Sequence, residues 1–323
     1  MWRKLSGGIA VAGLVALACV SATAASPGLR GGITDSGAAY YHDPADFYPA
    51  LEELGVHLLR VHLNWGGKLG VATRRPREGT DFEDPAYDWH LYDRVALQAE
   101  RYGVELVFTI FGTPAWANGG GAPTRAPTNA ARLREFAYAA ATRYSGTYVR
   151  ADGKVLPRVR YWTAWNEPNL QIGLIPQWRR VGKRWVIQSA IDYARICNAV
   201  VDGVHTSMLR GQKVACGVTL GNIDDLVHEL TRLYGPKRIW LTEYGYQTNP
   251  PDGVFGVSWA TQARYVGEAF AIARANPRID MLLWFLLQDE GDPTRWQSGF
   301  ISADGKRKPS FEAFREALAE LKR

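Results

Sequence analysis

Apolar and polar positions along the chain follow two periods in turn, which predicts strands and helices that alternate. Short apolar runs rich in β-branched and aromatic residues are typical of buried strands, and amphipathic stretches closed by glycine are typical of helices. The predicted strands cover residues 29–34, 57–63, 105–111, 161–165, 213–218, 239–244 and 281–287. The predicted helices cover residues 44–54, 89–102, 129–144, 189–209, 223–233, 259–276 and 310–322. Such alternation favours an α/β fold, with a parallel sheet wrapped by helices.

Two of the predicted strands end in a glutamate. Residues 161–169 read Tyr-Trp-Thr-Ala-Trp-Asn-Glu-Pro-Asn, so that Glu167 stands where a buried strand opens into a loop. Residues 239–246 read Ile-Trp-Leu-Thr-Glu-Tyr-Gly-Tyr and place Glu243 in the same situation. A lone glutamate there would be explained by an ion pair with an arginine. Two carboxylates at two strand ends can instead serve as the acid/base and the nucleophile of a glycoside hydrolase.

The ordered pair Trp-Asn-Glu-Pro and Trp-Leu-Thr-Glu-Tyr-Gly resembles the clan A glycoside hydrolases, which are retaining (β/α)8 barrels, and families 5 and 39 in particular. The resemblance covers nearly the whole chain after residue 25. It implies a TIM-type barrel whose functional groups lie at the C-terminal ends of the strands. It also implies hydrolysis of β-linked oligo- or polysaccharides, with Glu167 as general acid and base and Glu243 as nucleophile. No metal and no other cofactor is implied.

The resemblance extends to further residues of the site. Asn166 is expected to bind the 2-hydroxyl of the sugar, and Arg60, on the second strand beside His62, is expected to hold the nucleophile. A structural ion pair is the alternative for Arg60. The remaining candidates are aromatic: Trp284 on the last strand, facing the sugar at the cleavage point; Tyr244, holding the nucleophile or lining the cleft; and Trp116, walling the cleft or simply packing.

One unit of the barrel is missing from the pattern. A barrel unit averages about 30 residues, so only one fits between residues 213 and 239, where the resemblance requires two. The sequence therefore predicts seven strands, without the sixth strand that brings a histidine and a tyrosine to the nucleophile in the clan. We expect residues 213–218 to pair directly with 239–244 and close the barrel. Two exposed sheet edges are the alternative.

The missing unit leaves three functions open. The first is a glycosidase with weak or absent activity, the second a carbohydrate-binding pseudoenzyme, and the third a structural or interaction protein. The chain has 323 residues, 46% of them apolar, and lacks a linker or repeat, so one barrel domain is predicted over residues 26–323. Residues 1–25 combine Arg3 and Lys4 with an apolar stretch and small residues, as signal peptides do. A secreted protein without a membrane segment in its mature form is expected, an uncleaved anchor being the alternative.

Charge and the remaining chemistry add little. The net charge of +6 comes without a nucleic-acid motif, so no nucleic-acid partner is expected, and the protein is expected to be a monomer. Residues 170–185 carry four basic residues and two tryptophans, which favour a solvated basic face or, alternatively, a grip on an anionic saccharide. The six histidines show no metal-ligand spacing. Cys197 and Cys216 either pair or remain buried thiols.

Overall fold

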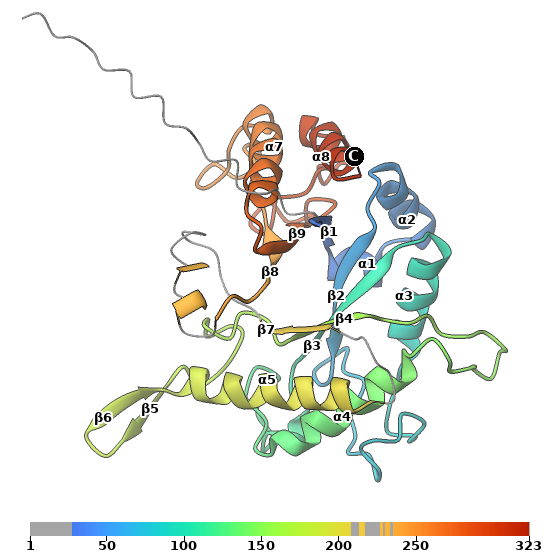
Figure 1. Ribbon diagram of the computed structural model, residues 1–323, viewed down its shortest axis with the longest axis vertical. Coiled ribbons are helices and arrows are strands. Elements are labelled where there is room, and N and C mark those ends of the chain that lie inside the picture. The colour runs from blue at the N-terminus through green and yellow to red at the C-terminus, as the bar shows by residue number, and fades with distance from the viewer. Residues whose placement is uncertain (1–27, 208–212, 217–226, 229, 233–234, 323) are drawn as a thin grey trace, which may run out of the picture.

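A curled parallel sheet wrapped by helices dominates the computed structural model, which describes residues 28–207, 213–216, 227–228, 230–232 and 235–322 (Figure 1). In these residues seven strands follow the order β7-β4-β3-β2-β1-β9-β8. They are β1 (Arg30–Thr34), β2 (Leu58–Asn64), β3 (Glu105–Phe111), β4 (Tyr161–Ala164), β7 (Lys213–Cys216), β8 (Ile239–Tyr244) and β9 (Ile279–Phe285). The α/β class and the count of seven strands, one short of a complete barrel, are confirmed.

The helices lie outside the sheet, close to their predicted bounds (Figure 1). They are α2 (Pro44–Glu53), α3 (His90–Arg101), α4 (Ala130–Arg143), α5 (Gln188–Thr206), α7 (Trp259–Ala275) and α8 (Pro309–Glu320). Local capping sets where several of them begin, since the Asn129 side chain accepts a hydrogen bond from the amide of Ala131 at 2.9 Å. The short α1 (Ser36–Tyr41) and the single turn η1 (Ala115–Ala117) were not predicted. Of the predicted helix 223–233, the described residues 227–228 and 230–232 are helical.

The expectation that the fifth and the nucleophile strand pair directly is wrong for the described residues. β7 pairs with β4 and β8 pairs with β9, so these two strands are the edges of the sheet. Closing seven strands requires a tilt and a stagger that match that number. The registers of the six observed pairs do not bring the two edges together, and the sheet remains an open, curled wall.

Side chains nevertheless meet across the interior of the curled sheet. Leu58, Val107, Met281 and Leu283 form a buried apolar cluster there, against which Tyr161 and Trp240 pack. The rings of Tyr161 on β4 and Trp240 on β8 lie 5.6 Å apart, edge to face, and so connect the two sides of the opening. This cluster fills the interior below the C-terminal strand ends, which leaves those ends as the place for a site.

The segment between β4 and α5 contains a hairpin that the sequence reading missed. Strands β5 (Trp178–Val181) and β6 (Arg184–Ile187) pair antiparallel through a two-residue turn in which Gly182 has a φ of 59°. Glycine in a two-residue connection favours such a turn, because the tight hairpin turns need a positive φ. The signal was present in the sequence, but the strands pair only with each other and carry mostly exposed residues.

Several predictions fall outside or at the margin of the described residues. The expected signal peptide, residues 1–25, lies outside them. In the described part of the chain, no helix is long and apolar enough to cross a membrane. Cys197 is disulfide-bonded, and the side chain of Cys216 lies outside the description.

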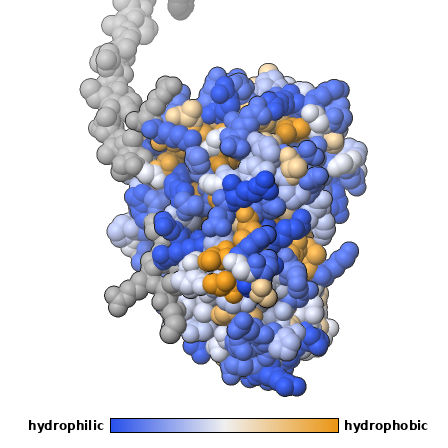
Figure 2. Space-filling view, turned by 90° about the vertical axis from the view of Figure 1, so that its right-hand side faces the viewer, coloured by the Kyte–Doolittle hydropathy of each residue, from blue (hydrophilic) through white to orange (hydrophobic). Residues whose placement is uncertain are grey.

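The face on the right of Figure 1 is mostly hydrophilic, with a small apolar area near its middle (Figure 2).

Helices α4 and α5 approach each other closely at Gly203, which gives a test of the packing. A Cβ atom at Gly203 would lie 2.4 Å from the carbonyl oxygen of Arg134 and 2.7 Å from the Cβ of Ala137. We expect Gly203→Ala to lower the free energy of unfolding by about 1–2 kcal/mol, because overpacking outweighs the better helix propensity of alanine. Urea denaturation measures this change.

Gly267 in α7 provides the matched control, because a Cβ atom there meets nothing within 4 Å. Gly267→Ala should leave the protein as stable or raise its stability by up to about 1 kcal/mol. Equal stability of the two variants would contradict the described packing of α4 against α5.

Candidate active site

Glu243 lies one residue before the C-terminal end of β8, in an irregular stretch of that strand. The pairing of β8 with β9 shifts register between Leu241 and Tyr244. Such irregularities redirect a side chain relative to a regular strand. The hydroxyl of Thr34 on β1 donates a hydrogen bond to the carbonyl of Thr242 at 2.6 Å. The backbone of β8 next to Glu243 is therefore hydrogen-bonded to β1, which lies on the other side of β9 from β8.

Arg60 connects four strands at this level of the sheet. Its side chain, on β2, is 2% exposed and makes an ion pair and hydrogen bond to the carboxylate of Glu243 through Nη1. Nη2 donates to Oδ1 of Asn166 at 2.7 Å, and Nε donates to the hydroxyl of Thr109 at 2.8 Å. Thr109 in turn lies 2.6 Å from the hydroxyl of Thr163 on β4. The structure thus brings Arg60, Glu243 and Asn166 together, and of these contacts the one between Arg60 and Glu243 was predicted.

Glu167 follows β4 in a loop whose backbone is strained. Trp165 and Glu167 have φ values of 66° and 41°, in the left-handed region that non-glycine residues rarely adopt. The indole of Trp165 donates to the carbonyl of Gly173 at 2.9 Å, which fixes the returning loop. A Cβ atom at Gly173 would lie 2.2 Å from the carbonyl oxygen of Glu167, so only glycine allows this approach. Strain held by such contacts is typical of functional sites.

The two carboxyl groups differ in their electrostatic surroundings. Burial raises the pKa of Glu167, and the negative charge of Glu243 raises it further, while Arg60 opposes the shift. Both residues are half-buried, and the side chain of Glu243 is 29% exposed. Glu243 contacts the guanidinium group of Arg60 directly, whereas no salt bridge is described for Glu167. The raised pKa of Glu167 favours this carboxyl group as the acid of the pair.

His62 completes the polar wall of the site on the face of β2 that carries Arg60. Its ring stacks on Phe111 with 5.3 Å between centroids. Burial, and then the charge of Arg60, lower the pKa of His62 to about 3, so that the imidazole is neutral. Within the described chain, Nε2 is buried and has no hydrogen-bond partner. Such an atom is costly and suits a polar ligand. The two-residue strand period had placed His62 beside Arg60, but it was not counted as a site residue.

The structure places Trp284 away from the sugar position that was expected for it. The residue is fully buried, its indole donates to the carbonyl of Ser298 at 2.8 Å, and its ring stacks on Phe300. Met281 and Leu283 face the barrel interior, so the two-residue period of β9 turns Trp284 outward and Phe285 inward. Applied to the sequence, that period would have identified Phe285 instead.

The other aromatic candidates also have partners of their own. The hydroxyl of Tyr244 donates to that of Tyr246 at 3.2 Å rather than to Glu243. The indole of Trp116 donates to the carbonyl of Ala72 at 2.8 Å, and its ring meets Trp65 edge to face. Trp116 is thus engaged with the loop after β2 and remains half-buried. Trp296, 52% exposed and edge to face with Phe285, is an aromatic residue at the rim that was not among the candidates.

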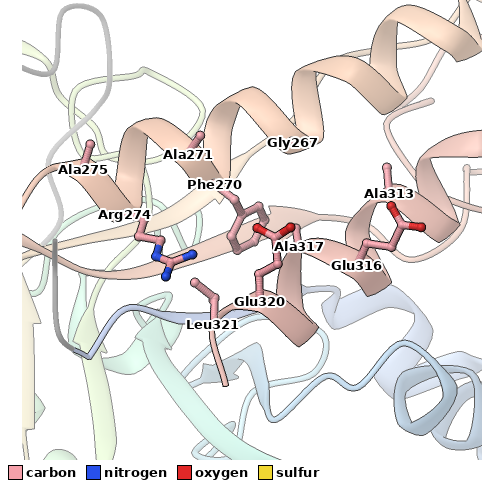
Figure 3. Close-up of a pocket in the computed structure, with 10 residues that line it drawn as sticks. All are labelled: Gly267, Phe270, Ala271, Arg274, Ala275, Ala313, Glu316, Ala317, Glu320 and Leu321. Atoms are coloured by element: carbon pink, nitrogen blue, oxygen red, sulfur yellow. The ribbon is translucent and has the colours of Figure 1, made fainter. Parts of the chain in front are cut away.

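A groove of the surface lies away from the two glutamates. It runs between α7 and α8 and is lined mainly by small residues, with Arg274, Glu316 and Glu320 around it (Figure 3). Neither Glu167 nor Glu243 borders it. In the described residues, no group of three or more His, Cys, Asp or Glu side chains could hold a metal ion.

Comparison with known proteins identifies the fold. No protein-family model and no curated protein matches the chain. Among solved structures, it is similar to a family 39 glycoside hydrolase from the gut symbiont Bacteroides cellulosilyticus WH2, with 17% identity and a TM-score of 0.61 over 93% of the chain. A family 39 β-xylosidase from Caulobacter crescentus gives 17% identity and a TM-score of 0.58 over 90% of the chain.

A glucosidase from Croceicoccus marinus aligns over 93% of the chain, with 13% identity and a TM-score of 0.62. The chain spans 65% of the Bacteroides protein, 70% of the Caulobacter protein and 68% of the Croceicoccus protein. At such low identities the likeness concerns the fold. The chain has the fold of the clan A glycoside hydrolase barrels, curled and parallel, with fewer than eight described units.

Proposed function

We propose that this chain is a secreted retaining β-glycosidase that cleaves β-linked oligo- or polysaccharides. The observation that carries the proposal is the contrast between the two carboxyl groups, with Glu243 bound to Arg60 and Glu167 raised in pKa by burial and by Glu243. The likeness in fold to family 39 glycoside hydrolases supports it. Export rests on residues 1–25, which carry the pattern of a signal peptide.

In the first step, Glu243 attacks the anomeric carbon while the bond to the leaving oxygen breaks. Glu167 gives its proton to that oxygen, so the aglycone departs neutral and a covalent glycosyl-enzyme remains. In the second step, the Glu167 carboxylate takes a proton from water, and the resulting hydroxide attacks the same carbon and releases Glu243. Two inversions leave the anomeric configuration unchanged, and the mechanism requires carboxyl groups about 5–5.5 Å apart.

The surrounding residues prepare this reaction. Arg60 holds the carboxyl group of Glu243 in place before substrate arrives, which lowers the cost of reorganisation. Asn166, whose Oδ1 is held by Arg60 and whose side chain also interacts with His62, stands where it can meet the sugar 2-hydroxyl. The neutral His62 can exchange a hydrogen bond with another hydroxyl through Nε2. Phe285 and Trp296 offer apolar faces for a sugar ring at the open side.

A second candidate, carbohydrate binding without turnover, is favoured by the open edge beside Glu243. β8 has no partner on the side away from β9 in the described chain, so the wall that a further strand would form there is incomplete. A nucleophile supported from one side is less well positioned, which lowers the rate. Binding of glycosides together with no turnover of any aryl glycoside would establish this alternative.

Replacement of the acid tests its role. Glu167→Ala should slow hydrolysis of glycosides with poor leaving groups by about 10²–10⁴-fold, because their departure needs a proton. Dinitrophenyl glycosides leave without protonation, so the first step should slow far less. Steady-state and burst kinetics on a series of aryl glycosides measure the difference. Glu243→Gln is the matched control and should abolish turnover of both kinds. Equal losses in Glu167→Ala would contradict the assignment.

The pKa of Glu167 tests the coupling between the two groups. Glu243→Gln removes a negative charge that raises the pKa of Glu167 and frees Arg60, which lowers it, so that pKa should fall. NMR titration of carboxyl-labelled glutamate, assigned with Glu167→Gln, measures it. In the native protein, activity should fall as pH rises through the pKa of Glu167, because the acid loses its proton.

Glu105→Gln is the control for this titration, because Glu105 pairs with Arg30 at the other end of the strands. It should leave the pKa of Glu167 unchanged. A pKa that does not move, or that rises, in Glu243→Gln would show that the two carboxyl groups do not interact.

A further inference from the structure

The β5–β6 hairpin is the most exposed structured part of the chain. It leaves the loop after Glu167 and projects beyond the N-terminal end of α5, clear of the rest of the fold (Figure 1). Helices of such barrels run antiparallel to the strands, so the N-terminus of α5 lies on the side of the C-terminal strand ends. The hairpin therefore extends from the face of the molecule that carries the two glutamates.

One face of the hairpin combines aromatic and cationic side chains. The register pairs Trp178 with Ile187 and Arg180 with Trp185, and directly paired residues share a face. Trp178 is 57% exposed and Trp185 is 67% exposed. The two indoles are diagonal neighbours on this face, at about 7–8 Å between backbone positions. Neither makes a ring contact within the described chain, so both are available to a partner.

The hairpin is also uniformly basic. Arg180 lies on the face of the two tryptophans, Arg179 and Arg184 lie on the opposite face, and Lys183 is in the turn. The sequence has no acidic residue between Glu167 and Asp192. Among the described residues, none of these four cations forms an ion pair. Nε of Arg179 donates to Gln188, and Nε of Arg180 donates to the carbonyl of Gly182, which leaves the terminal nitrogens of both guanidinium groups to other partners.

The base of the hairpin is coupled to the loop of the acid. The amide nitrogen of Gln177 donates to the carbonyls of Pro168, Leu170 and Leu174 at 3.0, 3.1 and 2.6 Å. Its amide oxygen accepts from the hydroxyl of Ser189 at 3.1 Å. The side chain of Gln177, which directly precedes β5, therefore connects the loop that follows Glu167 with the start of α5. The hairpin is therefore held in a fixed relation to the site.

We propose that this face binds a polysaccharide that carries carboxylate groups, as a remote subsite of the catalytic cleft. The inference rests on the proposed function and defines its substrate class as acidic, uronate-containing glycans. Indole faces suit the apolar faces of sugar rings, and guanidinium groups bind carboxylates in a bidentate manner. A second contact point on one chain raises the affinity of the whole by effective concentration.

Two other occupants fit the observations less well. A membrane-inserting hairpin would place its aromatic residues at the tip, whereas here the tip is Gly182-Lys183 and Trp178 stands at the base. A second copy of the chain would bring two sets of four uncompensated cations together, which is unfavourable. A polyanion whose sugar rings stack along the length of the hairpin matches both the charge and the spacing.

The test compares the native chain with the double variant Trp178→Ala/Trp185→Ala. Both residues are exposed, so the variant should fold like the native protein. Its affinity for polygalacturonate and for glucuronate-substituted xylan should fall about tenfold or more, because exposed aromatic anchors carry much of such binding energy. Calorimetric titration measures the affinity. Ile172→Ala, at a 74% exposed position on the same loop but outside the hairpin, should have no effect.

Charge is tested in the same assay. Arg180→Gln should weaken binding to the acidic glycans and not to neutral xylan, and salt should weaken native binding, because screening acts on charged contacts. Hydrolysis of a small aryl glycoside should be unchanged in all hairpin variants. If the native chain does not hydrolyse the small aryl glycoside, the proposed function is refuted. The binding of acidic glycans by the hairpin can still be measured in that case, so the two failures are distinguishable.

Three results would overturn the inference. The first is equal affinity of the native chain and the double tryptophan variant for both acidic glycans. The second is hairpin-dependent binding to phosphatidylglycerol vesicles with no binding to the glycans, which would assign the hairpin to a membrane. The third is a dimer in sedimentation that the double variant abolishes, which would assign it to a second copy.

Discussion

The buried guanidinium group of Arg60 is the constraint on which the site depends. A charge that is 2% exposed is unfavourable unless its hydrogen bonds are satisfied, and the partners come from β3, the end of β4 and β8. Those strands approach Arg60 from both sides of the curled sheet. The ion pair between Arg60 and Glu243 therefore also holds together the wall on which both glutamates stand. Removing either Arg60 or Glu243 would leave the other charge without its counter-ion and would lower the free energy of unfolding by about 3–5 kcal/mol.

The ion pair between Arg60 and Glu243 matters more because the sheet has two open edges in the described chain. Backbone hydrogen bonds do not join β7 to β8 in the described chain, so only side chains connect the two sides. Below Arg60, the rings of Tyr161 and Trp240 make such a contact, and Arg30 donates to the hydroxyl of Tyr161 at 2.5 Å. In the described chain, side-chain packing in the interior thus joins the two sides, while the hydrogen-bond ladder of the sheet stays open. A site at its upper end can persist although one unit is missing.

The sequence predicted the order of the main helices and of the seven strands of the sheet, because buried strands and amphipathic helices have strong local signatures. The contact of Arg60 with Glu243 was predicted from the resemblance to the clan. It failed where tertiary geometry decides. Apolar runs do not show whether two edge strands meet, so the direct pairing of β7 and β8 was wrong. Residue type alone did not show that Trp284 packs into the buried core, which the period of β9 and the fold around it decide. The strained loop around Glu167 depends on Gly173, whose role appears only when the backbones meet.

The most direct test of the account is covalent trapping of the nucleophile. A 2-deoxy-2-fluoro β-glycoside with a dinitrophenyl leaving group reacts with the enzyme to form the glycosyl-enzyme. This intermediate is hydrolysed slowly and accumulates, because fluorine at C2 destabilises the oxocarbenium-like transition state. Peptide mass spectrometry of the inactivated protein then locates the sugar. We predict one label per chain, on Glu243. A label on another residue, or continued turnover of natural glycosides without any label, would contradict the assignment of Glu243 as the nucleophile that Arg60 holds.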